Sequence, residues 1–214
     1  MNVFLKPDVA KEYDAYYNTE IGKKVNKIEE NLIAKLLKEV PKSEMLELGC
    51  GTGHWTNFFT NNGFQVTATD ISNEMMNIAK TKSIQTKFIK ADSQNIPFPD
   101  NSFSVVSSIT MLEFVDDQDK VLSEIYRVLK PGGWLILGCL NKFSELGKNK
   151  KNDTTFRDAK FLSQAELENK LKLFGKPKIN SGVYFSPIFE ILDDTSKIAN
   201  TEPAFMAAAV QKIK

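Results

Sequence analysis

The stretch MLELGCGTGHWT (45–56) joins a short apolar run to a glycine-rich turn that leads into a helical pattern. The run MLELG (45–49) predicts a buried strand that stops at a glycine, and WTNFFTNN (55–62) fits a helix closed by Gly63. Glycines let a ligand approach the backbone, and the start of the following helix presents free N–H groups. The stretch therefore predicts a ligand-binding turn at the carboxyl end of a first strand, where doubly wound folds bind nucleotides.

The segments on both sides of this turn alternate between strand and helix patterns. The expected strands are 45–49, 65–70, 86–92, 103–110, 134–140, 178–185 and 203–210. The expected helices are 21–40, 55–62, 72–80 with Ser72 as N-cap, 117–130, and a last one that the capping box SQAE (163–166) opens and Gly175 closes. Such alternation predicts an α/β fold, a doubly wound and mostly parallel seven-stranded sheet covered on both faces.

Composition excludes several classes of protein. The formal net charge of +1 gives no case for a nucleic-acid partner. The two cysteines fit a reducing compartment, and a single histidine makes a zinc site of the usual composition improbable. The chain begins without a signal-peptide pattern and has no apolar stretch long enough to span a membrane. We therefore expect a cytoplasmic protein with no membrane span.

The glycine spacing distinguishes two kinds of nucleotide site. A dinucleotide fingerprint requires G-x-G-x-x-G, whereas residues 49–53 read G-x-G-x-G, which disfavours a nicotinamide dehydrogenase. The acidic Glu47 before the turn suits a ligand with an ammonium and a sulfonium better than a pyrophosphate. Asp70, at the end of the second expected strand, can accept both hydroxyls of a ribose.

Four motifs in order carry a family resemblance: ELGCGTGHWT (47–56), VTATDIS (66–72), FIKADSQNIPFPDNSFSVV (88–106) and EIYRVLKPGGWLIL (124–137). They resemble the class I S-adenosylmethionine-dependent methyltransferases of the ubiquinone/menaquinone-biosynthesis type. The match runs from about residue 9 to residue 140. The resemblance implies a Rossmann-like fold, S-adenosylmethionine as cofactor and S-adenosylhomocysteine as product.

The resemblance also implies a cofactor site at the strand ends. Glu47 and the glycine turn would hold the methionine moiety, Asp70 the ribose, and Asp92 the exocyclic amine of adenine. The implied cofactor-binding residues are Tyr13, Glu47, Gly49, Cys50, Gly51, Gly53, Asp70, Ile71, Met75, Asp92, Ser93 and Ile109.

Among these, Ile71 and Met75 would pack against the adenine, near the backbone N–H of Ser93. Ile109 would face the methionine end, and Tyr13 would close over the cofactor. Structural alternatives stay open, because aspartates at strand ends also cap turns and the tyrosines of segment 13–17 could pack as ordinary core residues. His54 is more typical of a first-turn helix residue than of a catalytic base.

The expected organisation is a single methyltransferase domain over residues 1–214. It comprises an N-terminal helical cap (1–40), a cofactor-binding core (41–140), a polar, lysine-rich lid loop (141–160), and a C-terminal helix and strands (161–214). The cap and the lid should both lie at the carboxyl edge of the sheet, over the cofactor cleft.

A motif that is absent after the fourth expected strand limits the class of methyl acceptor. SSITMLEF (107–114) has no Asn/Asp-Pro-Pro-Tyr/Phe motif of the enzymes that methylate amino groups in DNA and proteins. We expect a small-molecule acceptor and methyl transfer by alignment and desolvation for an in-line displacement. No catalytic residue is required, and Glu113 and Tyr184 are weak candidates for a base. The alternative is a non-catalytic partner subunit that binds S-adenosylmethionine or S-adenosylhomocysteine; the sequence does not indicate an oligomeric state.

Overall fold

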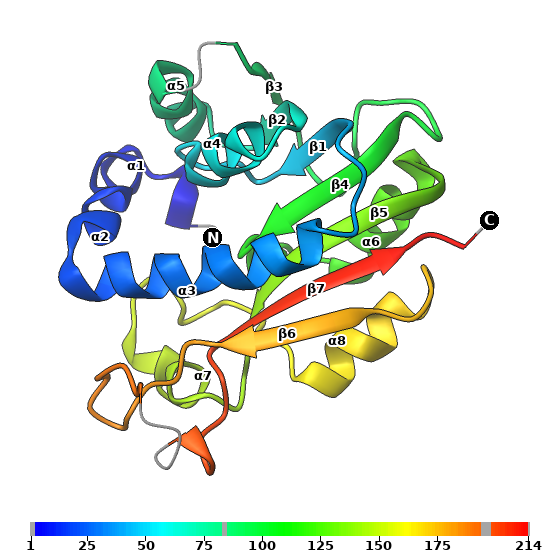
Figure 1. Ribbon diagram of the computed structural model, residues 1–214. Coiled ribbons are helices and arrows are strands. Elements are labelled where there is room, and N and C mark those ends of the chain that lie inside the picture. Colours follow the sequence, from blue (N-terminus) through cyan, green and yellow to red (C-terminus); the bar gives the residue numbers. More distant parts are fainter. Residues whose placement is uncertain (1–2, 83–84, 194–197, 214) are drawn as a thin grey trace.

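The computed structural model describes residues 3–82, 85–193 and 198–213. Its centre is a seven-stranded sheet in the order β3-β2-β1-β4-β5-β7-β6 (Figure 1). The strands are β1 (Glu44–Leu48), β2 (Gln65–Asp70), β3 (Lys87–Lys90), β4 (Phe103–Ile109), β5 (Leu129–Leu140), β6 (Lys178–Gly182) and β7 (Phe205–Gln211). Strands β1 to β5 pair in parallel, and β7 lies antiparallel between β5 and β6. The expected doubly wound, mostly parallel sheet is confirmed.

Helices connect and cover these strands. The α-helices are α1 (Pro7–Tyr13), α2 (Ala15–Asn18), α3 (Glu20–Leu37), α4 (His54–Asn61), α5 (Asn73–Lys82), α6 (Gln118–Val128), α7 (Glu145–Asn149) and α8 (Gln164–Leu171). Short 3₁₀ helices are η1 (Val3–Leu5), η2 (Leu112–Phe114) and η3 (Lys150–Asn152). In the described part of the chain, no helix combines the length and apolar character that crossing a membrane requires.

Neighbouring residues of the central strands enter two separate cores. Met45 and Val105 pack in the core that α3 and α4 cover, whereas Leu46 and Val106 pack in the core that α6 and α8 cover. This alternation follows from the two-residue period of a strand, and burial on both faces explains why the strands read as continuous apolar runs. Figure 1 shows α3 crossing in front of the sheet, with α6 and α8 behind it.

Two segments differ in kind from the sequence expectations, besides shifts of up to three residues at the ends of other elements. The helix expected over 117–130 ends at Val128, and β5 begins at Leu129, so the Pro131–Gly133 segment belongs to a strand rather than to a turn. An irregular register between β4 and β5 accommodates this segment. The expected lid loop 141–160 contains the helices α7 and η3. Ser144 caps α7 by accepting the N–H of Gly147. Because α7 is short and polar, apolar periodicity does not reveal it.

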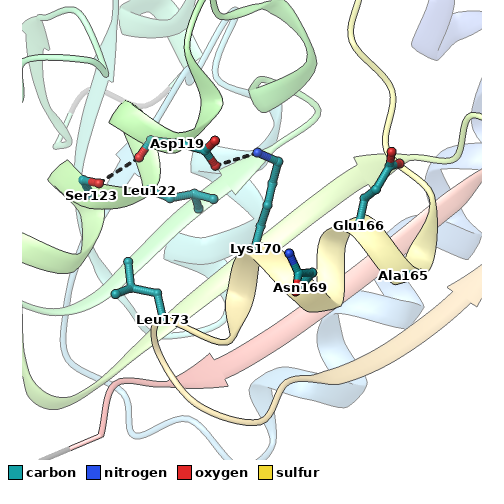
Figure 2. A pocket seen from close by; sticks show the side chains of 8 residues that line it. All are labelled: Asp119, Leu122, Ser123, Ala165, Glu166, Asn169, Lys170 and Leu173. Carbon is teal, nitrogen blue, oxygen red and sulfur yellow. Dashed lines mark hydrogen bonds and ion pairs between the residues drawn. The ribbon is translucent and has the colours of Figure 1, made fainter.

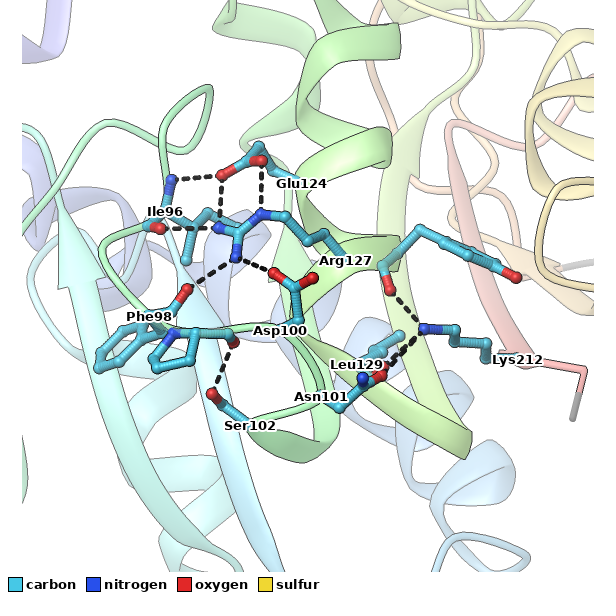
Figure 3. Close-up of polar contacts among 11 residues, drawn as sticks. Ile96, Phe98, Asp100, Asn101, Ser102, Glu124, Arg127, Leu129 and Lys212 are labelled. Atoms are coloured by element: carbon cyan, nitrogen blue, oxygen red, sulfur yellow. Dashed lines mark hydrogen bonds and ion pairs between the residues drawn. The ribbon is translucent and has the colours of Figure 1, made fainter.

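The connection from β3 to β4 is fastened to α6 by one arginine (Figure 3). Arg127 donates to both carboxylate oxygens of Glu124 at 2.8 Å and to the carbonyls of Ile96 and Phe98 at 2.9 and 2.8 Å. Glu124 in turn accepts the Ile96 N–H at 2.9 Å. Bidentate arginine–carboxylate pairs are strong and directional. Part of the EIYRVLKPGG motif therefore has a structural role, since it holds the segment that follows β3.

Candidate active site

The turn after β1 is built from glycines with left-handed backbone angles. Gly49, Gly51 and Gly53 have φ values of 72°, 53° and 83°. The N–H groups of Gly49 and Cys50 both donate to the Thr69 carbonyl, at 2.8 and 2.9 Å, which ties the turn to β2. The Cys50 side chain is buried, and burial raises the pKa of its thiol, so this residue acts as a small buried part of the turn.

The three glycines differ in what surrounds them. An added Cβ would lie 2.3 Å from Met111 at Gly49 and 2.9 Å from Ala79 at Gly53. At Gly51 it would meet no atom within 4 Å. The turn is therefore packed on two sides and open at Gly51, where a ligand can lie directly against the backbone.

Asp70 lies beside this open position. Its Oδ2 accepts the Gly51 N–H and its Oδ1 accepts the Ser72 N–H, both at 2.8 Å. Burial raises the pKa of Asp70, although these backbone hydrogen bonds oppose the shift. Each carboxylate oxygen can accept a further hydrogen bond, so ribose hydroxyls could bind without displacing the contacts that order the turn.

Glu47 is a buried acid directly before the turn, with 2% of its surface exposed. Thr56 donates a 2.5 Å hydrogen bond to its Oε2. Burial raises the pKa of Glu47 to about 8. A buried carboxylate without an opposite charge is unfavourable, and an ammonium group bound nearby would stabilise its ionised form. The residue therefore fits the methionine end of the cofactor.

The expected adenine side is more exposed. Ile71 keeps 40% of its surface accessible, whereas Met75 keeps 2% and offers little area to a ligand. Asp92 is exposed and accepts the Gln94 N–H at 2.9 Å, so its carboxylate closes the turn after β3. Ser93 lies half-buried next to it. Any adenine contact made by Asp92 would add to this structural role.

The end of β4 forms the opposite wall. Ile109 is buried, and Thr110 follows it with a φ of 49°, a strained angle for a β-branched residue. The Thr110 N–H donates to the Gly138 carbonyl at 2.7 Å. This bend brings Met111 against Gly49 and leads into η2.

The N-terminal helices are tied to the glycine turn. Thr52 donates a 2.6 Å hydrogen bond to Asp14, which also pairs with Lys82 of α5 at 2.5 Å. The Tyr17 ring stacks on His54 with a centroid separation of 4.1 Å. His54 is thus the packed first residue of α4, and burial lowers its pKa.

Aromatic rings join the N-terminal segment to the expected lid. Tyr13 contacts Phe4 and Tyr17 at centroid separations of 5.7 and 5.9 Å. Phe4 also contacts Phe114 at 4.7 Å, and Phe114 contacts Phe156 at 6.1 Å. Both segments therefore meet at the ring that follows β4, at the carboxyl edge of the sheet. Their opening and closing remains a prediction.

Two further buried carboxyl groups lie near this edge. Glu113 is 2% exposed; its Oε1 accepts the Leu140 N–H at 2.6 Å, and burial raises its pKa to about 7. Glu29 of α3 is half-buried, and burial together with the charges of Glu30 and Glu113 raises its pKa to about 8. Sequence reasoning missed Glu29, because an acid on an amphipathic helix reads as a solvated residue. Tyr184, the other weak base candidate, lies after β6 and pairs through its carbonyl with Leu192.

A separate groove of about 530 Å³ lies between α6 and α8 (Figure 2). Lys170 bridges its walls by pairing with Asp119 at 2.6 Å. The residues that line this groove include no glycine of the turn after β1 and no acid at the end of a strand. The groove is therefore distinct from the site at the carboxyl edge of the sheet.

Both this strand order and this glycine turn are those of enzymes that take a methyl group from a sulfonium donor. The chain belongs to the class I S-adenosylmethionine-dependent methyltransferases. The profile of a family described as a methyltransferase domain matches residues 46–137. Along its whole length the chain is 34% identical to an uncharacterized protein of Methanocaldococcus jannaschii, with all of both chains covered.

Two more relatives extend the comparison. A malonyl-[acyl-carrier protein] O-methyltransferase of Pectobacterium atrosepticum is 30% identical over 128 residues, which cover 58% of this chain and only 51% of that relative. A solved methyltransferase of Thermotoga maritima, described as a "possible histamine N-methyltransferase", superposes with a TM-score of 0.77. It is 25% identical, with 99% of this chain and 100% of the other covered. S-adenosylmethionine is therefore the cofactor of this chain.

Proposed function

We propose that this chain transfers the methyl group of S-adenosylmethionine to a small-molecule acceptor by aligning and desolvating the two reactants. The open position at Gly51, next to the Asp70 carboxylate and in a turn that Thr52 links to the N-terminal helices, is the observation that carries this proposal. S-adenosylmethionine carries the methyl group on a sulfonium, and the group that leaves when the methyl is transferred is a neutral thioether.

The residues of the turn would position the donor. The Glu47 carboxylate would pair with the ammonium of the methionine moiety, since its burial leaves it without an opposite charge. Asp70 would accept the ribose hydroxyls, and the exposed Ile71 would pack against the adenine. Such contacts would fix the position and orientation of the bound donor, so that its methyl group is held ready for attack by the acceptor.

The segments above the turn would exclude water. Phe4, Tyr13 and Phe156 come from two separate segments and lie in one connected set of ring contacts through Phe114. A dry site strengthens the electrostatic contacts within it and protects the sulfonium from competing reactions. A small acceptor suits such a covered site better than a folded macromolecule does.

The descriptions of relatives support this preference unequally. The Thermotoga maritima relative, similar over the whole chain, is described as a "possible histamine N-methyltransferase", a description that names a small molecule. The Pectobacterium atrosepticum relative is named for an acyl group on a carrier protein, but the similarity spans only half of that protein. A non-catalytic subunit is disfavoured because the Gly51 opening and both site acids, Glu47 and Asp70, are present.

The test uses S-adenosylmethionine labelled in its methyl group. The protein is incubated with a cell lysate divided into a small-molecule filtrate and a macromolecular retentate. We expect labelled product from the filtrate. Label only in the retentate would contradict a small-molecule acceptor, and no label in either fraction, with tight cofactor binding measured by calorimetry, would favour the non-catalytic reading.

A further inference from the structure

One carboxylate oxygen near the end of β4 has no hydrogen-bond partner in the described part of the protein. Glu113 uses Oε1 to accept the Leu140 N–H at 2.6 Å, whereas its Oε2 is buried and unpaired. The residue is 2% exposed. Leaving a buried acceptor unsatisfied is unfavourable, so the position is suited to a donor group that a bound molecule brings.

A second acid is coupled to the first. Glu29 of α3 interacts electrostatically with Glu113 and with the tyrosines of the N-terminal helices, Tyr13, Tyr16 and Tyr17. Burial raises its pKa, and the side chain still keeps accessible surface that a bound molecule could reach. The two acids therefore influence each other, and among the described residues no lysine or arginine forms an ion pair with either of them.

The rings around these acids suit a positive charge as well. Phe114 directly follows Glu113, and it contacts Phe4, which contacts Tyr13. The faces of aromatic rings attract ammonium groups, and the attraction grows when water is excluded. A neutral acceptor could give a hydrogen bond to the unpaired oxygen but would leave both acids without an opposite charge, and an anionic acceptor would be repelled by them.

We propose that the acceptor is a small organic amine, bound as an ammonium by Glu29 and Glu113 beneath the rings of Tyr13 and Phe114. This inference rests on the proposed function and names its substrate class. Glu29 binds the amine, and Glu113 is the general base that prepares the nitrogen for attack.

The chemistry balances with one proton released. The ammonium gives a proton to the Glu113 carboxylate, which frees the lone pair of the nitrogen. That lone pair forms the new N–C bond to the methyl group as the C–S bond breaks, with its electron pair staying on sulfur. The products are a methylated ammonium and the neutral thioether, and Glu113 passes the captured proton to solvent.

The first test asks which acceptors are methylated. The small-molecule filtrate of a lysate is separated by ion exchange into cationic, neutral and anionic pools, and each is incubated with labelled cofactor. We expect labelled product from the cationic pool. Label from the neutral or anionic pool alone, or none from the cationic pool while S-adenosylhomocysteine still binds by calorimetry, would overturn the amine proposal and leave the cofactor site intact.

The second test reads binding without turnover. Propylammonium chloride should raise the Tm of the protein saturated with S-adenosylhomocysteine, whereas equal concentrations of 1-propanol or sodium chloride should not. Glu113→Gln and Glu29→Gln should abolish this shift and keep S-adenosylhomocysteine affinity within about threefold. Glu20→Gln is the matched control, because Glu20 is an exposed acid on the same helix as Glu29. Equal shifts in all variants would overturn the proposal.

The variants should also differ in kinetics. Glu113→Gln should lower kcat/KM by about a hundredfold or more and remove the rise of the rate with pH, since general bases contribute roughly that factor. Glu29→Gln should act mainly on KM, by about tenfold, because it removes one charged hydrogen bond. An unchanged pH profile in Glu113→Gln would exclude Glu113 as the base.

Discussion

The Thr52 hydroxyl donates a 2.6 Å hydrogen bond to the Asp14 carboxylate, and this bond connects the glycine turn to the N-terminal helices. The turn and the segment that covers it are therefore linked before any ligand is present. A ligand that settles against the turn should also order the covering segment.

We expect Thr52→Val to loosen the cover. Valine keeps the shape of threonine but removes the hydroxyl, so amide hydrogen exchange in residues 3–20 should become faster in the ligand-free protein. In the unmodified protein, S-adenosylhomocysteine should slow exchange in 3–20 and in 141–160. Identical traces with and without ligand would indicate static packing and no lid.

Gly51→Ala should fold but lose cofactor binding. The new Cβ meets no protein atom within 4 Å, so the variant pays only the strain of a left-handed angle, about 1 kcal/mol. Calorimetry should show S-adenosylhomocysteine affinity reduced by more than about tenfold. Gly63→Ala is the matched control, because its φ of 87° is also left-handed and the nearest atom to its Cβ would be 3.9 Å away on Lys42. Equal affinity in the two variants would show that Gly51 is only structural.

Asp70→Asn should separate ligand binding from turn structure. The amide retains one oxygen acceptor for the Gly51 or Ser72 N–H, whereas alanine would remove the acceptor of both. We expect S-adenosylhomocysteine affinity to fall by about tenfold or more, as for loss of a charged hydrogen bond. Binding unchanged by calorimetry would remove Asp70 from the ribose site.

The ligand-free protein should lose stability between about pH 6.5 and 8. Burial raises the pKa of Glu29 and Glu47 to about 8 and that of Glu113 to about 7, so the folded state holds protons that the unfolded state has released. The free energy of unfolding then falls as pH rises, by at most about 1.4 kcal/mol per pH unit for each group. The measurement starts near pH 6.5 to limit the opposing effect of His54. Because the pKa of His54 is lowered in the folded state, its loss of a proton increases stability as pH rises.

Urea unfolding across this range checks the sign. Glu47→Gln should flatten the slope, because the amide cannot titrate, and Glu20→Gln should leave it unchanged. A stability that rises with pH in the unmodified protein would contradict the assignment. Saturation with S-adenosylmethionine should reduce the slope, because the ammonium favours ionised Glu47.

Arg127→Lys should destabilise the fold without touching the cofactor. Lysine cannot reproduce the paired bonds to Glu124 together with those to the Ile96 and Phe98 carbonyls. We expect a loss of about 1–3 kcal/mol in the free energy of unfolding. The control is Arg157→Lys at an exposed position, which should match the unmodified protein. A large loss of cofactor affinity in the folded Arg127→Lys protein would argue against a purely structural motif.

Local patterns predict most of the fold. The buried strand before Gly49 and the acid at the end of the next strand follow from apolar periodicity and from the rule for strand ends. The Pro131–Gly133 segment was misplaced, because the pairing of β5 with its neighbours overrides a turn-forming composition.

The acceptor side was harder to predict, since its contacts join residues far apart in sequence. Nothing local to Glu29 indicates that it interacts electrostatically with the tyrosines of the N-terminal helices and with Glu113, which follows β4. Likewise, the bond between Asp14 and Thr52 spans 38 residues. Such contacts arise from topology, which periodicity and motif spacing describe only indirectly.

The position of Phe114 has a consequence for the order of events in a catalytic cycle. Its ring contacts Phe4 at a centroid separation of 4.7 Å and Phe156 at 6.1 Å, so both covering segments pack against the same side chain. Movement of either segment away from Phe114 would remove part of the packing around the ring that the other segment contacts. Entry of the acceptor and departure of the spent donor would then be coupled, because both require these segments to open.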